Sequence, residues 1–121
     1  MTPQNAACWF EIPVSDLSKA SAFYNAVLKT TLKEEIMGPN VTHVFPTAGQ
    51  GGVGGHLYIG KPSAKGTGNT IHLVAPDQLE DAMARVTAQG GQVVTPVIAI
   101  PAGRFAYCLD LDGNSFGLFT F

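Results

Sequence analysis

The chain has 121 residues, of which 45% are hydrophobic and 13% are charged, and its formal net charge at pH 7 is −2. A chain of this length is expected to form one domain that buries its own core. The low charge, without a run of basic residues, excludes the basic face that nucleic acids require, and no apolar segment is long enough to span a membrane. We therefore expect neither a nucleic acid nor a membrane as a partner.

The N-terminus and the cysteines indicate a cytoplasmic protein. The chain does not open with a charged segment followed by an apolar run, so we expect no signal peptide. Cys8 and Cys108 both fall in strand-like runs, and the preferred interpretation is two buried thiols in a reducing compartment. A disulfide between them is the alternative.

The first half of the chain predicts a strand, a helix and three further strands. Residues 8–14 alternate and carry Trp, Phe, Ile and Val, which is typical of a strand. Ser15 or Asp16 can cap a helix over residues 17–28, where apolar side chains recur at three-and-four spacing. The further strands are predicted at 31–37, 41–45 and 56–59, with a turn at 38–40.

The second half repeats this order. Residues 70–75 predict a strand, and a helix begins at Asp77, with Glu80 completing a capping box. Asp81 and Arg85 have the spacing of an exposed ion pair, and Gly90 and Gly91 end the helix. Strands follow at 92–95, 105–109 and 116–121. The Asp-Gly pair in 110–114 indicates a hairpin rather than a calcium loop.

The repeat predicts an α+β fold built from two βαβββ modules. Module one covers about 1–60 and module two about 67–121, within a single domain over 1–121. The Gly-, Ser- and Lys-containing segment 60–69 connects them as an exposed linker. Two such units side by side are expected to form a curved mixed sheet around a cleft, with both helices on the outer face.

Two segments carry a family resemblance. "IPVSDLSKASAFYNAVL" resembles the opening strand and helix of the vicinal oxygen chelate superfamily, the glyoxalase, bleomycin-resistance and extradiol-dioxygenase group. "LDLDGNSFGLF" resembles its closing hairpin and last strand, with Leu111 in place of the usual Pro, and "GGVGGHL" resembles smaller glyoxalase-like members. The resemblance covers nearly the whole chain. It is specific for the fold and weak for activity, because this fold hosts several chemistries.

The resemblance implies a divalent metal on the inner face, held by His, Gln or Glu from the first and last strands of each module. Carried over position by position, these places fall on Trp9, Ile71 and Gly117, and near Gly55 or His56. Indole, aliphatic and glycine residues cannot ligate such a cation, and a catalytic site needs about three protein ligands. We therefore expect neither a metal nor another cofactor.

The remaining site residues leave alternatives open. Trp9 provides a stacking surface for a ligand, or it is a core or interface residue. Glu11 on the same face is an acid or base, or a solvated rim residue. His56 follows a Gly-rich stretch and belongs to a lid or to a bulged strand. Arg104 contacts an anionic ligand or is a surface residue. Phe119 is expected to add contact surface.

Two other histidines are interpreted as structural or surface residues, because neither has a second ligand at metal spacing. They are His43 and His72, and the strand alternation predicts that His72 faces the helices. We see no Ser-His-Asp arrangement, and no catalytic residue is assigned.

These observations lead to three hypotheses. The first is a metal-free protein of the glyoxalase fold that binds a small apolar or aromatic molecule in its cleft by sequestration. The second is a metal-dependent lyase, isomerase or dioxygenase, with ligands drawn from Glu11, His43, His56 or His72. The third is a noncatalytic subunit whose cleft is filled by Trp9 and Phe121. The resemblance also implies a homodimer, whereas the sequence does not identify the ligand.

Overall fold

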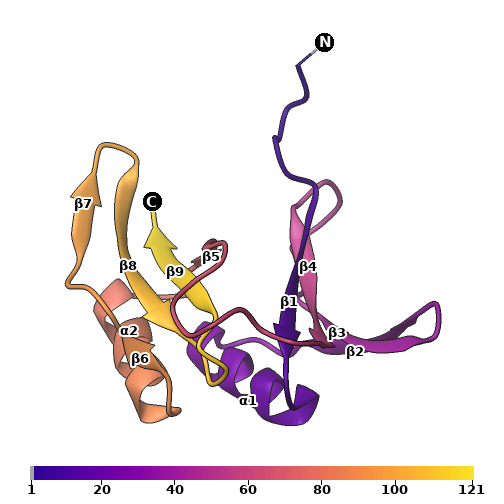
Figure 1. The fold of residues 1–121 in the computed structure, drawn as a ribbon. Helices are drawn as coiled ribbons and strands as arrows, with labels where there is room; N and C mark the ends of the chain where they lie inside the picture. The colour runs from indigo at the N-terminus through magenta and orange to yellow at the C-terminus, as the bar shows by residue number, and fades with distance from the viewer. Residues whose placement is uncertain (1) are drawn as a thin grey trace.

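The computed structural model describes residues 2–121 and has the predicted α+β architecture of two helices and mixed sheets in two modules (Figure 1). Module one contains β1 (Trp9–Val14), α1 (Leu17–Leu28), β2 (Lys33–Met37), β3 (Asn40–Val44) and β4 (Gly54–Ile59). Module two contains β5 (Ile71–Val74), α2 (Leu79–Ala88), β6 (Gln92–Val93), β7 (Ile98–Ile100), β8 (Gly103–Leu109) and β9 (Ser115–Thr120). The strand β7 was not predicted from the sequence.

Each module forms its own sheet. Sheet A has the order β1-β4-β3-β2, and sheet B has the order β5-β9-β8-β6, with β7 also pairing to β8. The first strand of each module runs parallel to the last, β1 beside β4 and β5 beside β9, and the other pairs are antiparallel. The sheets rise as two walls with α1 and α2 beneath them (Figure 1).

Alternation along the strands gives each sheet a helix face and an open face. In β1, Ile12 and Val14 are buried toward the helices, whereas Trp9 and Glu11 point to the opposite side, because successive strand residues face opposite ways. In sheet B, Leu73 and Leu118 occupy the helix face. The helix faces of both sheets and the inner sides of both helices share one core.

The helix starts differ between the modules. The Asp16 side chain accepts a hydrogen bond from the Lys19 amide at 2.9 Å, which confirms the predicted cap of α1. The predicted capping box at Asp77 is wrong, because Gln78 is the N-cap of α2 and makes no side-chain capping bond. The Asp77 carboxylate is instead bound by Arg85 and Lys29.

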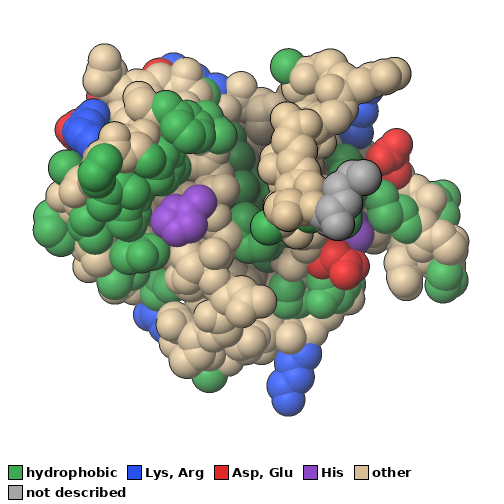
Figure 2. Space-filling model, turned by 90° about the horizontal axis from the view of Figure 1, so that it is seen from above, with side chains coloured by type: hydrophobic (Ala, Val, Ile, Leu, Met, Phe, Trp, Pro, Cys, Tyr) green, Lys and Arg blue, Asp and Glu red, His purple; other side chains and the backbone are tan. Residues whose placement is uncertain are grey.

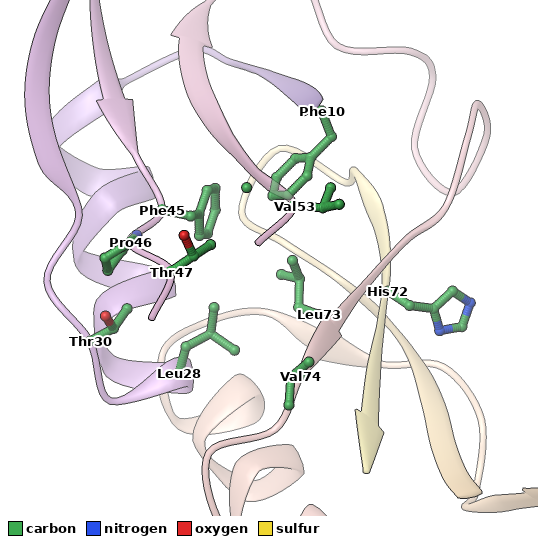
Figure 3. Close-up of a pocket in the computed structure, with 11 residues that line it drawn as sticks. Phe10, Leu28, Thr30, Phe45, Pro46, Thr47, Val53, His72, Leu73 and Val74 are labelled. Atoms are coloured by element: carbon green, nitrogen blue, oxygen red, sulfur yellow. The ribbon is translucent and has the colours of Figure 1, made fainter. Parts of the chain in front are cut away.

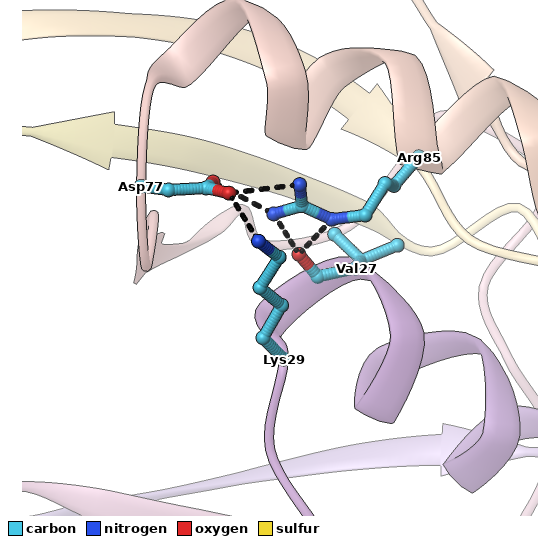
Figure 4. A network of polar contacts seen from close by, with 4 residues as sticks. All are labelled: Val27, Lys29, Asp77 and Arg85. Carbon is cyan, nitrogen blue, oxygen red and sulfur yellow. Dashed lines mark hydrogen bonds and ion pairs between the residues drawn. The ribbon is translucent and has the colours of Figure 1, made fainter.

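The network around Asp77 joins the two helices (Figure 4). Arg85 reaches Asp77 through both terminal guanidinium nitrogens, at 3.0 and 2.8 Å, and also donates to the Val27 carbonyl near the end of α1. The predicted pair between Asp81 and Arg85 is therefore wrong. A guanidinium satisfies several acceptors at once, so it serves the free carbonyl of α1 and a carboxylate of module two together.

The predicted hairpin at 110–114 is confirmed, and it connects the modules. The buried Asp110 carboxylate accepts from the backbone amides of Asp112 and Asn114 and from the Tyr24 hydroxyl of α1. The Asn114 side-chain amide donates to the Pro13 carbonyl in β1 at 2.8 Å. Gly113 adopts a φ of 81°, a left-handed conformation that glycine takes without a steric cost.

The two cysteines have different environments. Cys108 is buried in β8, as predicted, whereas Cys8 is exposed and precedes β1, so the prediction of two buried thiols is wrong for Cys8. Both thiols are free. Within residues 2–121, neither helix is long and apolar enough to cross a membrane.

Candidate functional site

The open face of sheet B presents three rows of side chains, defined by the strand register. The first row is Val74, Phe119 and Phe105, and the second is His72, Gly117 and Tyr107. The third row pairs Ser115 with Leu109, and Thr70 joins it through a hydrogen bond of 2.7 Å between the Thr70 and Ser115 hydroxyls. The face is therefore aromatic at one end and polar at the other.

The aromatic end forms a pocket around an imidazole. The His72 ring contacts Phe105, Tyr107 and Phe119 at centroid distances of 5.3, 5.8 and 6.1 Å. The rings of Phe105 and Phe119 lie nearly parallel, at 6° and 5.9 Å. A pocket of about 420 Å³ is lined by His72, Val74, Ile100, Phe105, Phe119 and Phe121. Hydrophobic side chains gather around a histidine on this side of the molecule (Figure 2).

The prediction from the sequence that His72 faces the helices is wrong. His72 lies on the open face, while Leu73 beside it enters the core. The last buried residue before α1 is Val14, three residues before Leu17, whereas the last buried residue before α2 is Ala75, four residues before Leu79. Because these separations differ by one residue, a position counted back from the helix by analogy with module one takes the wrong strand parity.

Gly117 occupies the centre of the open face, opposite His72 in the register. A Cβ atom at Gly117 would lie 2.3 Å from His72 Nδ1, so only glycine lets the imidazole rest over β9 in this position. Gly117 and Phe119, both predicted site residues, therefore share this face with His72. The glycine contributes space rather than a chemical group.

Three other predicted site residues gather on the open face of sheet A. The Trp9 indole N–H donates to His56 Nδ1 at 2.8 Å, and His56 Nε2 lies 3.1 Å from Glu11 Oε1. Because Nδ1 accepts, a neutral His56 carries its proton on Nε2, facing the carboxylate. His56 is buried within β4, which supports the strand interpretation rather than a lid.

The last two predicted site residues lie elsewhere. Arg104 is on the helix face of sheet B, where its guanidinium binds the Glu80 carboxylate of α2 at 2.8 Å. This interaction lowers the pKa of Glu80, and Arg104 does not share a face with Phe119. Ile71 packs against the core and also borders a pocket of about 190 Å³ that includes Glu11.

A further pocket lies between the modules and is shown in Figure 3. It has a volume of about 280 Å³, and its walls are largely apolar. Phe10, Phe45 and Val53 line it from module one, and Leu73 and Val74 line it from module two. His72 stands at its border, with its imidazole directed away from the other labelled side chains (Figure 3). The strand β5 thus contributes to both this pocket and the aromatic one.

The structure also brings together a hydroxyl, an imidazole and a carboxylate that were not predicted to be neighbours. Ser21 Oγ lies 2.5 Å from His43 Nδ1, and His43 Nε2 lies 3.6 Å from Glu34 Oε1. Ser21 is only 7% exposed, and its hydroxyl points from α1 toward His43 of β3, so a substrate cannot reach it. We assign these residues to packing between helix and sheet, in agreement with the structural role predicted for His43.

The donor groups do not fit the metal that the resemblance implies. Both His56 nitrogens face protein partners, Trp9 and Glu11, and Gly117 has no donor atom. His72 stands among aromatic rings. No group of three His, Cys, Asp or Glu side chains that could hold a metal ion occurs in the part of the chain that the structure describes. A catalytic zinc or iron site takes about three protein ligands, and residues 2–121 alone do not assemble them.

The aromatic residues of module two were largely missed from the sequence. Phe105 and Tyr107 stand two residues apart in β8, as do Phe119 and Phe121 at the chain end. This spacing puts each pair on one face, and it is the signal that could have found the pocket. The sequence does not show that β8 and β9 are neighbours with Phe105 opposite Phe119.

A sequence profile of the Glyoxalase/Bleomycin resistance protein/Dioxygenase superfamily matches residues 8–118. The chain belongs to this superfamily. No curated protein matches the chain. Among solved structures, similar chains within the superfamily include a glyoxalase/bleomycin resistance protein from Albidiferax ferrireducens T118, with 20% identity and a TM-score of 0.71 over 95% of this chain and 98% of that one.

Two other superfamily structures are similar over nearly the full length of the chain. The fosfomycin resistance protein FosX from Listeria monocytogenes has 20% identity and a TM-score of 0.69, covering 99% of this chain and 93% of that one. A superfamily member from Sphaerobacter thermophilus DSM 20745 has 26% identity and a TM-score of 0.64, covering 95% and 96%. At about 20% identity, a likeness shows the fold alone.

Proposed function

We propose that the chain binds a small, planar apolar or aromatic molecule on the open face of sheet B, without a protein-bound metal. The observation that carries this proposal is the pocket of about 420 Å³ in which aromatic and aliphatic side chains surround one imidazole. Ligand sites are typically concave and apolar, with few polar groups that orient the bound molecule. The partly exposed Phe119 ring, which lies nearly parallel to the buried Phe105 ring, offers a face against which a flat molecule can pack.

Binding alone suffices for a sequestering protein. The Trp9, His56 and Glu11 side chains bind one another, so their polar groups are committed within the chain. Resistance by sequestration, as in the bleomycin-resistance branch of the superfamily, is the biological role that we propose, in the cytoplasm. Catalysis is not part of this proposal.

We also expect a homodimer. Phe121 is 88% exposed and Val74 is 63% exposed, next to the apolar pocket. Apolar side chains gathered in this way favour coverage by a ligand or by a second subunit. A second copy could cover the rim of the pocket and leave its floor to the ligand. Sedimentation equilibrium of the wild type and of Phe121→Ser tests this expectation, because a homodimer that uses this rim should weaken in the variant.

The alternative is a metal-dependent lyase, isomerase or dioxygenase of the same superfamily. One observation favours it, since the His72 imidazole makes no hydrogen bond to any residue in 2–121 and is exposed. Other donors would then have to come from a second subunit. Elemental analysis of protein purified without chelators separates the two proposals, and stoichiometric zinc, nickel or iron that His72→Ala loses would establish the alternative.

The binding proposal is tested by calorimetric titration with neutral planar probes such as indole and naphthalenemethanol. We expect saturable binding to the wild type and a loss of about tenfold or more in Phe119→Ala, which removes one of the parallel rings. Ile36→Ala, at an exposed position of β2, is the matched control and should bind like the wild type. Absence of binding for every probe in the wild type contradicts the proposal.

A further inference from the structure

The open face of sheet B changes from apolar to polar along its strands. The row of Val74, Phe119 and Phe105 is followed by His72 and Tyr107, and then by the hydroxyls of Thr70 and Ser115. Successive rows stand two strand residues apart, or about 7 Å. A molecule of two fused rings that lies along the strands therefore contacts both the aromatic row and the imidazole.

A second pocket continues the face at its polar end. It has a volume of about 470 Å³ and is lined by Lys65, Gly66, Thr70, Gln92, Val94, Tyr107, Leu109 and Ser115. Tyr107 belongs to this pocket and also contacts His72, which lines the aromatic pocket. The two pockets therefore meet at these side chains. Lys65 makes no ion pair with a carboxylate of residues 2–121.

The groups that face His72 are neutral. From β9 they are Gly117 and Phe119, and from β8 they are Phe105 and Tyr107, of which only the Tyr107 phenol titrates. Ile100 from β7 is also apolar. No Asp or Glu side chain lines either of the two pockets.

The carboxylates of the surrounding elements have other partners. Glu80 binds Arg104 on the helix face, Asp112 binds the amide and hydroxyl of Ser15, and Glu11 faces His56 on sheet A. The titratable side chains along the two joined pockets are therefore an imidazole, a phenol and an ammonium. Two of these three are bases, and none is a carboxyl group.

We propose that the ligand is an aromatic carboxylate, with its rings on the aromatic row and its acid group between His72 and the Lys65 end of the face. This inference rests on the binding function proposed above and assigns the chemical class of the ligand. Hydrogen bonds to a carboxylate from charged donors are roughly twice as strong as neutral ones. Protonated His72 would be such a donor, and Lys65 would attract the same charge from the polar end.

The test compares naphthoate with its neutral isostere naphthalenemethanol by calorimetric titration at about pH 5.5 and about pH 8, a range in which histidine changes its charge. The wild type should bind naphthoate about tenfold more tightly than the alcohol at the lower pH. This preference should shrink at the higher pH. Affinity for the alcohol should change little with pH.

Variants identify the residues responsible. His72→Gln should keep binding the alcohol but lose the pH-dependent preference for naphthoate. Lys65→Gln should weaken naphthoate severalfold and keep the pH dependence, whereas Lys61→Gln, an exposed lysine outside both pockets, is the matched control. Thermal unfolding of each variant verifies that it folds.

The outcomes separate the two proposals. If the wild type binds both probes equally well at both pH values, the aromatic-carboxylate inference is overturned and the binding function stands. If neither probe binds, both are overturned. If His72→Gln keeps the full pH dependence, the imidazole does not recognise the acid, and the inference is likewise overturned.

Discussion

The Tyr24 hydroxyl donates a hydrogen bond of 2.6 Å to Asp110 Oδ2, joining α1 of module one to the hairpin between β8 and β9. The pair is buried, and Asp110 also receives the Asp112 and Asn114 amides and the Asn114 side chain. Burial, followed by the nearby Asp110 carboxylate, raises the pKa of Tyr24 well above its usual value. This contact couples the stability of the two modules.

Tyr24→Phe removes the hydroxyl and keeps the ring. We expect the free energy of unfolding to fall by about 1.5 to 3 kcal/mol, the range for a hydrogen bond to a charged group. Urea denaturation monitored by circular dichroism measures the change. Asp110→Asn should cost at least as much, because it weakens several bonds of the turn. A Tyr24→Phe variant as stable as the wild type would show that the contact contributes nothing.

Because the Cys108 thiol is buried, we expect the protein to lose stability at alkaline pH. Burial raises the pKa of its thiol from the ordinary 9.0 to about 11. Between these values the unfolded chain loses the proton and the folded chain keeps it, so the free energy of unfolding falls as pH rises, by up to about 2 to 3 kcal/mol. Below about pH 9 there is no effect. Urea denaturation across this range should show a shallower decline for Cys108→Val than for the wild type.

Because the Asp77 carboxylate is bound by Arg85 and Lys29, we expect the protein to lose stability in acid. Hydrogen bonds from Arg85 and then Lys29 lower the pKa of this carboxyl from 3.8 to about 2. Its contribution is therefore fully present above about pH 4 and disappears as pH falls through about 2, because the unfolded chain takes up the proton first. Acid unfolding followed by circular dichroism should show this dependence in the wild type. Asp77→Asn should lack it, and Asp81→Asn is the control.

Trp9 is the single tryptophan of the chain and reports on His56. His56→Phe removes the acceptor for the indole N–H and keeps a ring in its place. We expect the tryptophan fluorescence of this variant to differ from that of the wild type at the same pH. Identical emission spectra in wild type and variant would mean that the imidazole does not determine the indole environment.

Gly117→Ala separates binding from stability. Its Cβ would displace the His72 imidazole, which is exposed and can rotate away. Because alanine loses less conformational entropy than glycine, the free energy of unfolding should stay constant or rise by up to about 1 kcal/mol. Affinity for naphthoate should fall severalfold. Unchanged affinity would show that the position of the imidazole over β9 is not needed.

Much of the fold could be predicted because its signals are local. The helix over residues 17–28 was predicted to the residue, since its apolar spacing lies within it and the Asp16 cap directly precedes it. The strand β7 was missed because it has only three residues and is defined by its pairing to β8. The start of α2 was misread, because an Asp followed by Glu at the third position fits a capping box, and only the tertiary partners Arg85 and Lys29 redirect the Asp77 side chain.

The candidate site was less predictable than the fold. Counting by analogy from the helices placed Trp9 correctly on the open face and His72 incorrectly on the helix face, because the core-facing residues precede α1 and α2 by separations that differ by one residue. Arg104 was considered as a ligand contact, but Glu80 lies within reach on α2 and binds it. A charged side chain pairs with an oppositely charged group that the fold brings close. When that group is distant in the sequence, no local pattern indicates the pair.

Periodicity and residue type were sufficient to predict the class of the fold and the repeated module. The tertiary structure decided which strands are neighbours, and so placed Phe105 against Phe119 and His72 over Gly117. The register between strands is set by long-range pairing, in which a shift of one residue exchanges the two faces. The pocket exists only because that register places the aromatic side chains on one face.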